Sequence, residues 1–308
     1  MRKHLGIYLR GIAMGAADVV PGVSGGTIAF ITGIYEKLLD SIKSFDLQAL
    51  QFALKLNIKS LWGHINGTFL VALFAGIATS IISLAKLIIY LMEYQAVPLW
   101  SFFCGLIVIS TILVLKEIKK WDLFSGVALL FGTIAAYAIT TLTPSTTPEA
   151  YWFIFLSGAI AICAMILPGI SGSFLLLVMG KYEFILNSLQ EFNIAVIIVF
   201  AMGCAFGLLS FSRVVSWLLK HYHSITVAAL AGFMIGSINK IWPWKEVVAY
   251  RLNSEGEKKP FITQNLLPNE YAEVVGSDPQ IILAVVFFVT GIVLIYLIDK
   301  LTGTISKN

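Results

Sequence analysis

Charged residues are scarce in this chain. They make up 12% of its 308 residues, whereas hydrophobic residues make up 58%; a typical soluble domain carries about 25% charged residues. Several apolar runs reach the roughly 20 residues that a helix needs to cross the hydrocarbon core of a bilayer. These runs are continuous rather than alternating over about ten residues, which favours helices over a β-barrel. The sequence therefore predicts an all-α polytopic membrane protein.

Cysteine and histidine are also rare. Cys104, Cys163 and Cys204 lie inside apolar segments without the close spacing of a metal or redox motif, so neither a disulfide framework nor a zinc site is indicated. The four histidines show no helix-spaced pair of ligands. We expect no metal and no cofactor.

Two well-known motifs for catalysis or nucleotide binding are missing. The chain contains neither the Gly-x-x-x-x-Gly-Lys-(Ser/Thr) phosphate loop nor the His-Glu-x-x-His zinc motif, which disfavours ATP-driven transport within this chain. The net charge is only +4 and is better explained by charged loops than by a nucleic-acid patch. We expect no catalytic residues and no nucleic-acid partner.

What the sequence does contain is a repeated interruption of its apolar segments. Pro21-Gly22-Val23-Ser24-Gly25-Gly26 recurs 147 positions later as Pro168-Gly169-Ile170-Ser171-Gly172-Ser173, and 7 of 16 positions are identical between residues 21–36 and 168–183. Proline and glycine interrupt a helix. Each copy therefore predicts a break at membrane depth.

The repeat extends beyond these breaks. Gly76, Lys86 and Gly105 align with Gly203, Arg213 and Gly232. We predict a first repeat at 1–145, with a hairpin at about 5–35 and spanning helices at about 67–91, 98–115 and 123–142. We predict a second repeat at 146–308, with a hairpin at about 151–180, spanning helices at about 193–219, 224–239 and 280–299, and an extracytoplasmic loop at 240–279.

The basic residues predict the orientation of these segments. Lys116, Lys119 and Lys120 lie in a short loop. Because cytoplasmic loops carry an excess of basic residues, we place this loop in the cytoplasm, together with Lys37 and the N-terminus. The first broken segment then enters and leaves by the same face, as a re-entrant hairpin. Each half has three spanning helices, an odd number, so the halves form an inverted-topology repeat with both termini cytoplasmic. The sequence leaves a homo-oligomer open.

Two hairpins that enter from opposite faces bring their breaks together near the midplane. The residues after each break begin a half-helix whose N–H groups and hydroxyls suit an anion, and paired broken helices indicate a transporter's substrate site. The alternative is that the glycines only allow close helix packing. The predicted phosphate-binding residues here are Ser24, Gly25, Gly26, Thr27, Ser171, Gly172 and Ser173.

Three basic residues inside apolar segments are further candidates for binding phosphate. Lys86 and Arg213 occupy matching positions of the repeat, and Arg10 lies in the first arm of the first hairpin. Cations at membrane depth commonly face a polar site. The alternative is that these side chains extend to the headgroups.

Three carboxylates are candidates for carrying protons. Asp18 precedes the first break by three residues, and Glu36 and Glu183 end the second arms of the two hairpins. A carboxylate buried at membrane depth is costly to ionise, so it is suited to proton coupling. The alternative is that Asp18 caps the nearby half-helix and that the glutamates lie at the interface.

The residues Gly15–Thr27, Pro168–Gly172 and Gly180–Glu183 resemble a family of bacterial polyprenyl-phosphate (undecaprenyl-phosphate) transporters. The resemblance covers nearly the whole chain. It implies a polyprenyl-phosphate lipid as partner and a flippase that recycles undecaprenyl phosphate from the outer to the inner leaflet of the bacterial cytoplasmic membrane. We expect alternating access, with proton coupling as a hypothesis. The recycled lipid would serve peptidoglycan and other envelope polymers.

Two other functions stay open at this point. One is a membrane-embedded polyprenyl-diphosphate phosphatase, for which Ser24 or Ser171 could supply a nucleophile. No paired glutamates or histidine stand at the breaks to support it. The other is a secondary transporter of a small anion.

Overall fold

The computed structural model describes residues 2–19, 23–145, 147–252 and 258–302. Among these residues, six helices are long and apolar enough to cross a membrane, which confirms the predicted polytopic membrane protein. They are α6 (Gly67–Tyr94), α7 (Ala96–Lys116), α8 (Leu123–Thr141), α12 (Ile194–His221), α13 (His223–Ser237, continued by the 3-10 turn η1, Ile238–Ile241) and α15 (Ile281–Thr302).

Each predicted hairpin is a pair of helices that fold back on each other. The first consists of α1 (Arg2–Val19) and α2 (Gly25–Ile31), and the second of α9 (Tyr151–Ile166) and α10 (Gly172–Val178). At 1.5 Å per residue the 16 residues of α9 extend about 24 Å, less than the ~30 Å hydrocarbon core. These lengths fit segments that break inside a membrane.

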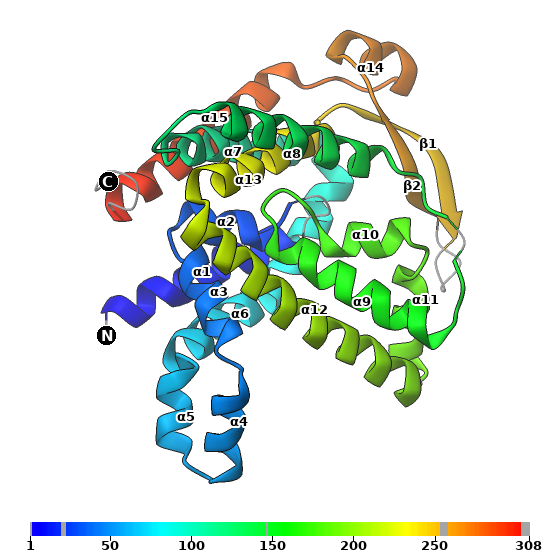
Figure 1. The fold of residues 1–308 in the computed structure, drawn as a ribbon. Coiled ribbons are helices and arrows are strands. Elements are labelled where there is room, and N and C mark those ends of the chain that lie inside the picture. Colours follow the sequence, from blue (N-terminus) through cyan, green and yellow to red (C-terminus); the bar gives the residue numbers. More distant parts are fainter. Residues whose placement is uncertain (1, 20–22, 146, 253–257, 303–308) are drawn as a thin grey trace.

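The same short helix follows each hairpin. It is α3 (Tyr35–Lys43) in the first half and α11 (Tyr182–Gln190) in the second. The first half adds α4 (Leu47–Leu54) and α5 (Ile58–His64), a helical pair that projects from the body of the molecule (Figure 1). Glu36 and Glu183 therefore begin α3 and α11 rather than end the hairpin arms.

The helices pair in a pattern that treats the two halves alike. Within each half, the first hairpin arm packs against the next long helix: α1 against α6, and α9 against α12. Between the halves, α8 packs against α13 and α15 against α7. α7 and α13 are the second long helix of their halves, and α8 and α15 are the third. The α15–α7 contact is therefore the α8–α13 contact with the two halves exchanged. The inverted orientation itself stays a prediction.

Glycines make these crossings close. A Cβ at Gly76 would overlap Tyr8 O of α1, and one at Gly203 would overlap Phe155 O of α9. Gly105 and Gly232 likewise meet backbone carbonyls of α15 and α8. The glycines aligned by sequence thus lie at equivalent crossings, because only a residue without Cβ lets two backbones approach so closely.

The stretch between η1 and α15 is not helical throughout. Strands β1 (Lys245–Leu252) and β2 (Lys258–Asn265) form an antiparallel pair that starts with Lys245 opposite Asn265, and α14 (Pro268–Val275) follows. We call β1, β2 and α14 the β-cap. Trp242 donates its ring N–H to Leu266 O, and Trp244 to Pro279 O, which ties the β-cap to the ends of the helices.

Candidate functional site

The two breaks lie against each other, although they are more than 140 residues apart in sequence. Ser24 Oγ donates to Met165 O at 3.1 Å, and Gly169 N donates to Thr27 Oγ1 at 3.0 Å. Gly26 packs on the carbonyl of Ile166, where a Cβ would not fit. We call this meeting point the hairpin junction. The contact between the breaks is confirmed, while Pro21 and Gly22 lie outside the described residues.

At the first break, the chain itself occupies the N–H groups of α2. Gly25 N donates to Asp18 Oδ1 at 2.7 Å, and Gly26 N donates to Ser24 Oγ at 3.1 Å. Thr27 N donates to Ser24 O. Ser24 is extended and buried, as an N-cap residue should be. Asp18 therefore caps α2, which is one of the two roles considered for it from the sequence. Its carboxylate lies at the start of α2, where the phosphate was expected to bind.

The second break has the same outline but different contacts. Ser171 precedes α10, and its hydroxyl shares a 2.9 Å hydrogen bond with Ser173 Oγ. Gly169 has a φ of +88°, a left-handed conformation that favours glycine. Among the described residues no side chain caps the start of α10, and Met165 stands where the first half has Asp18. The two halves of the junction are thus chemically unequal.

The three predicted cations are not part of the contacts at the junction. Lys86 on α6 and Arg213 on α12 have exposed side chains, and Arg10 on α1 is half-buried. None of them forms an ion pair with a described carboxylate. Their role in binding phosphate stays a prediction, and their exposure also fits the alternative in which they extend to the headgroups.

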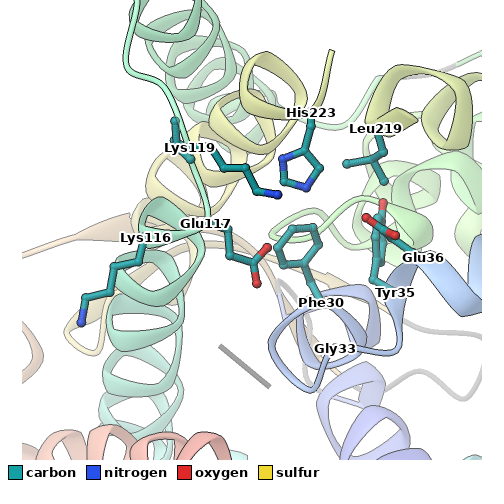
Figure 2. Close-up of a pocket in the computed structure, with 10 residues that line it drawn as sticks. Phe30, Gly33, Tyr35, Glu36, Lys116, Glu117, Lys119, Leu219 and His223 are labelled. Carbon is teal, nitrogen blue, oxygen red and sulfur yellow. The ribbon is translucent and has the colours of Figure 1, made fainter. Parts of the chain in front are cut away.

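A cavity of about 720 Å³ opens where the first hairpin, α7 and α12 end, and we call it the large cavity. Glu36, Lys116, Lys119 and His223 line it, and Figure 2 shows Lys119 and His223 on one side with Tyr35 and Glu36 across from them. Among the described residues, the buried Tyr35 Oη and His223 Nδ1 have no hydrogen-bond partner. Unpartnered buried polar atoms need an explanation such as a bound group.

Sequence reasoning missed this cavity. Lys116 and Lys119 served only to orient a loop, and His223 was not among the predicted site residues. A signal that pointed here lies at the end of the repeated stretch, where Tyr35-Glu36 recurs as Tyr182-Glu183, because Tyr35 and Glu36 form one wall of the cavity. Among the other candidate acids, Glu183 lies half-buried at the start of α11.

Ser24 also stands at the centre of Gly22-Val23-Ser24-Gly25-Gly26, which has the Gly-x-Ser-x-Gly spacing of a hydrolase nucleophile. That motif activates serine only on a strand-to-helix turn beside a base. Here the serine follows the helix α1, and its hydroxyl donates to Met165 O. The surroundings of Ser24 therefore do not support a nucleophile.

Residues 14–259 match the family described as Undecaprenyl phosphate translocase-like. This chain is a member of that family. The matched region begins inside α1 and includes both breaks and the start of the β-cap. It thus covers every candidate site residue except Arg10.

Two relatives carry the name "Polyprenyl-phosphate transporter". The protein from Vibrio cholerae serotype O1 is 47% identical over 298 residues, which is 97% of each chain. The protein from Staphylococcus aureus is 32% identical over 256 residues, covering 76% of this chain and 85% of that one. Both names denote transporters rather than enzymes, which goes against the phosphatase alternative. No solved structure matches this chain.

Proposed function

We propose that this protein transports polyprenyl phosphate across the bacterial cytoplasmic membrane, from the outer to the inner leaflet. The observation that carries this proposal is the hairpin junction, where two broken helices from the two halves of a family member meet. Broken helices at corresponding places in two repeats mark the substrate sites of many transporters. The names of the two relatives support the lipid class.

The phosphate group binds at the hairpin junction in this proposal. The hydroxyls of Ser24, Thr27, Ser171 and Ser173 and the N–H groups of Gly25, Gly26 and Gly172 are the donors. Arg213, Lys86 and Arg10 supply positive charge as the two halves move. The polyprenyl tail stays in lipid, because the lipid tail needs no polar partner while a bare phosphate in hydrocarbon costs many kcal/mol.

Proton coupling enters through Asp18. Its carboxylate accepts the Gly25 N–H that the phosphate would use, so the two anions compete for one donor. Protonation removes the charge of Asp18 and weakens this hydrogen bond, which frees the donor for the substrate. Glu36, at the edge of the large cavity, and Glu183 are the remaining candidates for passing the proton on.

Alternating access is supported by an inequality between the halves. On α3, Asp40 accepts a hydrogen bond from Ser216 of α12 at 3.2 Å and lies 3.7 Å from Lys220. No packing of comparable extent joins α11 to α6 in the part of the chain that the structure describes. In our proposal the α3–α12 contact closes the cytoplasmic end, and it opens when the halves rock.

The test is translocation by the purified protein in liposomes. Polyprenyl phosphate is supplied in the outer leaflet, and the fraction of headgroup still accessible from outside is followed with time. We expect faster loss than in protein-free liposomes and at least a tenfold lower rate for Arg213→Gln. The matched control Lys59→Gln removes an exposed charge from α5 and should keep the full rate.

Four outcomes would count against parts of the proposal. Equal rates with and without the protein would reject transport. Release of inorganic phosphate from polyprenyl diphosphate would favour the phosphatase, and uptake of a soluble anion alone would favour the small-anion transporter. Equal rates with and without a pH gradient would reject proton coupling only.

A further inference from the structure

A second cavity, of about 210 Å³, lies between the second hairpin and the β-cap. Its walls come from the end of α8, from α10, from η1 and from β2. The residues that matter for its chemistry are Thr140, Phe174, Asn239, Lys240, Lys245 and Asn265. We call it the β-cap cavity. Phe174 is on α10, the helix that begins at Ser171-Gly172-Ser173, so the cavity adjoins the second break.

Two lysines line the β-cap cavity. Lys240 Nζ lies 4.2 Å from the ring centroid of Phe174, and Lys245 Nζ lies 4.1 Å from that of Trp100. Lys245 Nζ also donates to the backbone carbonyl of Lys240. Both side chains are half-buried, and none of the ion pairs formed by described residues involves either of them.

This arrangement is electrostatically unfavourable without an anion. Two like charges in a partly desolvated space repel each other more strongly than they would in water. Aromatic rings offset the loss of solvent for an ammonium only partly. Burial, and secondly the charge of Lys240, lower the pKa of Lys245 to about 7. A bound anion would relieve both effects.

The polar wall of the cavity is fixed by a chain of amides. Asn265 Nδ2 of β2 donates to Asn239 Oδ1 at 2.9 Å, and Asn239 Nδ2 donates to Thr140 Oγ1 of α8 at 3.0 Å. These bonds join the β-cap to α8 and η1, so the space around the lysines is held by three separate elements. A site built in this way is preorganised rather than a chance cluster of surface lysines.

The β-cap cavity also resembles the large cavity in its place within the repeat. Phe30 lines the large cavity and Leu177 lines the β-cap cavity, and these two residues align in the repeat. Each cavity lies at the end of an equivalent helix, α7 or α13, and each contains two lysines: Lys116 and Lys119, or Lys240 and Lys245. Equivalent parts of the two halves therefore line the two cavities.

We propose that Lys240 and Lys245 form a second anion-binding site, separate from the hairpin junction and suited to the doubly charged group of a phosphate monoester. Two ammonium groups match the charge of such a group. The identity of the ligand as a lipid headgroup rests on the proposed function, whereas the anion chemistry rests on the cavity alone. Under that function, the site receives the phosphate at the extracytoplasmic end before it reaches the junction.

The test measures binding by the full-length protein in detergent, titrated separately with sulfate, inorganic phosphate and a short-chain polyprenyl phosphate. We expect Lys240→Gln/Lys245→Gln to weaken binding at least tenfold, while Lys59→Gln changes nothing. Lys245→Arg keeps the charge and should keep most of the affinity. If the double variant does not fold, each single variant should still show a severalfold loss.

The pH dependence gives a second readout. Sulfate keeps its charge between pH 6 and pH 8, so a change in its affinity reports on the protein. Lys240 and Cys104 are the groups whose charges act on Lys245. With a pKa of about 7, Lys245 is mostly charged at pH 6 and mostly neutral at pH 8, so sulfate should bind up to about tenfold more tightly at pH 6. Lys245→Gln should abolish this difference.

The outcomes separate the site from the function. Unchanged binding of all three anions in the double variant would overturn the proposal, whatever the translocation assay shows. Lysine-dependent binding of polyprenyl phosphate supports a lipid headgroup site, and lysine-dependent binding of inorganic phosphate alone supports a site for free phosphate. Lysine-dependent binding in a protein that does not translocate lipid would leave the site standing and reject the proposed function.

Discussion

At the scale of single residues, the hairpin junction depends on a few side chains that satisfy the backbone of the other half. Thr27 Oγ1 accepts from Gly169 N, and Ser24 Oγ donates to Met165 O. Backbone groups released by a helix break must find partners inside the protein, because lipid offers none. Small hydroxyl side chains do this without separating the two backbones.

Thr27→Val tests this role. The substitution preserves shape but leaves the buried Gly169 N–H without its acceptor, which costs about 1–3 kcal/mol. We expect a lower midpoint of thermal unfolding in detergent. The control is Thr32→Val, because Thr32 is equally buried but its hydroxyl only donates within its own helix, to Ile28 O. A smaller drop in the thermal midpoint for Thr27→Val than for Thr32→Val would contradict the role of Thr27 as an acceptor for Gly169 N–H.

At the scale of the elements, the helices are held together by close backbone crossings. Gly132 and Gly232 face each other where α8 crosses α13. Where α7 crosses α15, Gly105 meets the backbone of Phe288 and Gly291 meets the backbone of Phe102. Lipid tails are as apolar as leucine, so helix association in a membrane relies on such packing rather than on the hydrophobic effect. These two crossings connect the halves.

Gly232→Leu should separate α8 from α13. The added side chain would meet Leu129 O and the backbone of Thr133, and overpacking of this kind costs about 1–3 kcal/mol or more. The matched control is Gly126→Leu on α8, since no neighbour in the part of the chain that the structure describes lies within 4 Å of a Cβ at Gly126. We expect a clear drop in the thermal midpoint for the first variant only. Equal thermal midpoints for the two variants would mean that α8 and α13 can move apart at this crossing without loss of stability.

At the scale of the whole molecule, the halves are joined in two ways. The crossings between α7, α8, α13 and α15 are extensive and apolar, whereas the α3–α12 contact is small and polar. Burial raises the pKa of Asp40, but the hydrogen bond from Lys43 and the charges of Lys43 and Lys220 outweigh it and lower the pKa overall. Asp40 thus stays ionised at neutral pH. An exposed ion pair is worth about 1 kcal/mol or less, which suits a contact that opens and closes.

Cross-linking the α3–α12 contact should stop transport if its opening is required. Asp40 and Ser216 are replaced by cysteine in a variant without the three native cysteines, and a short reducible linker joins them. We expect translocation in liposomes to fall at least tenfold and to recover after reduction. The control pair replaces Asp46 and His64 of the same half, whose Oδ1 and Nε2 atoms lie 3.1 Å apart. Unimpaired transport by the linked Asp40–Ser216 pair would reject this contact as a gate.

The sequence by itself determined the membrane helices and the position of both breaks. Apolar stretches in a bilayer must satisfy their own backbone, so composition alone specifies helices. The predicted spans at 67–91 and 123–142, for example, correspond to α6 (Gly67–Tyr94) and α8 (Leu123–Thr141). The repeated Pro-Gly-x-Ser-Gly pattern located the breaks, because proline and glycine interrupt a helix at their own position. The β-hairpin inside 240–279 was not predicted.

Only the tertiary structure decided which groups face one another. Asp18 caps Gly25, Lys86 and Arg213 are exposed, and Lys240 and Lys245 share a cavity with β2. The local sequence around Asp18 suits a cap and a proton carrier equally, and the pattern of an apolar helix does not reveal which side its one cation faces. These outcomes depend on contacts across the chain, such as the one between Ser24 and Met165. Packing between segments that are far apart in the sequence determines these contacts, and the local sequence around each residue does not predict that packing.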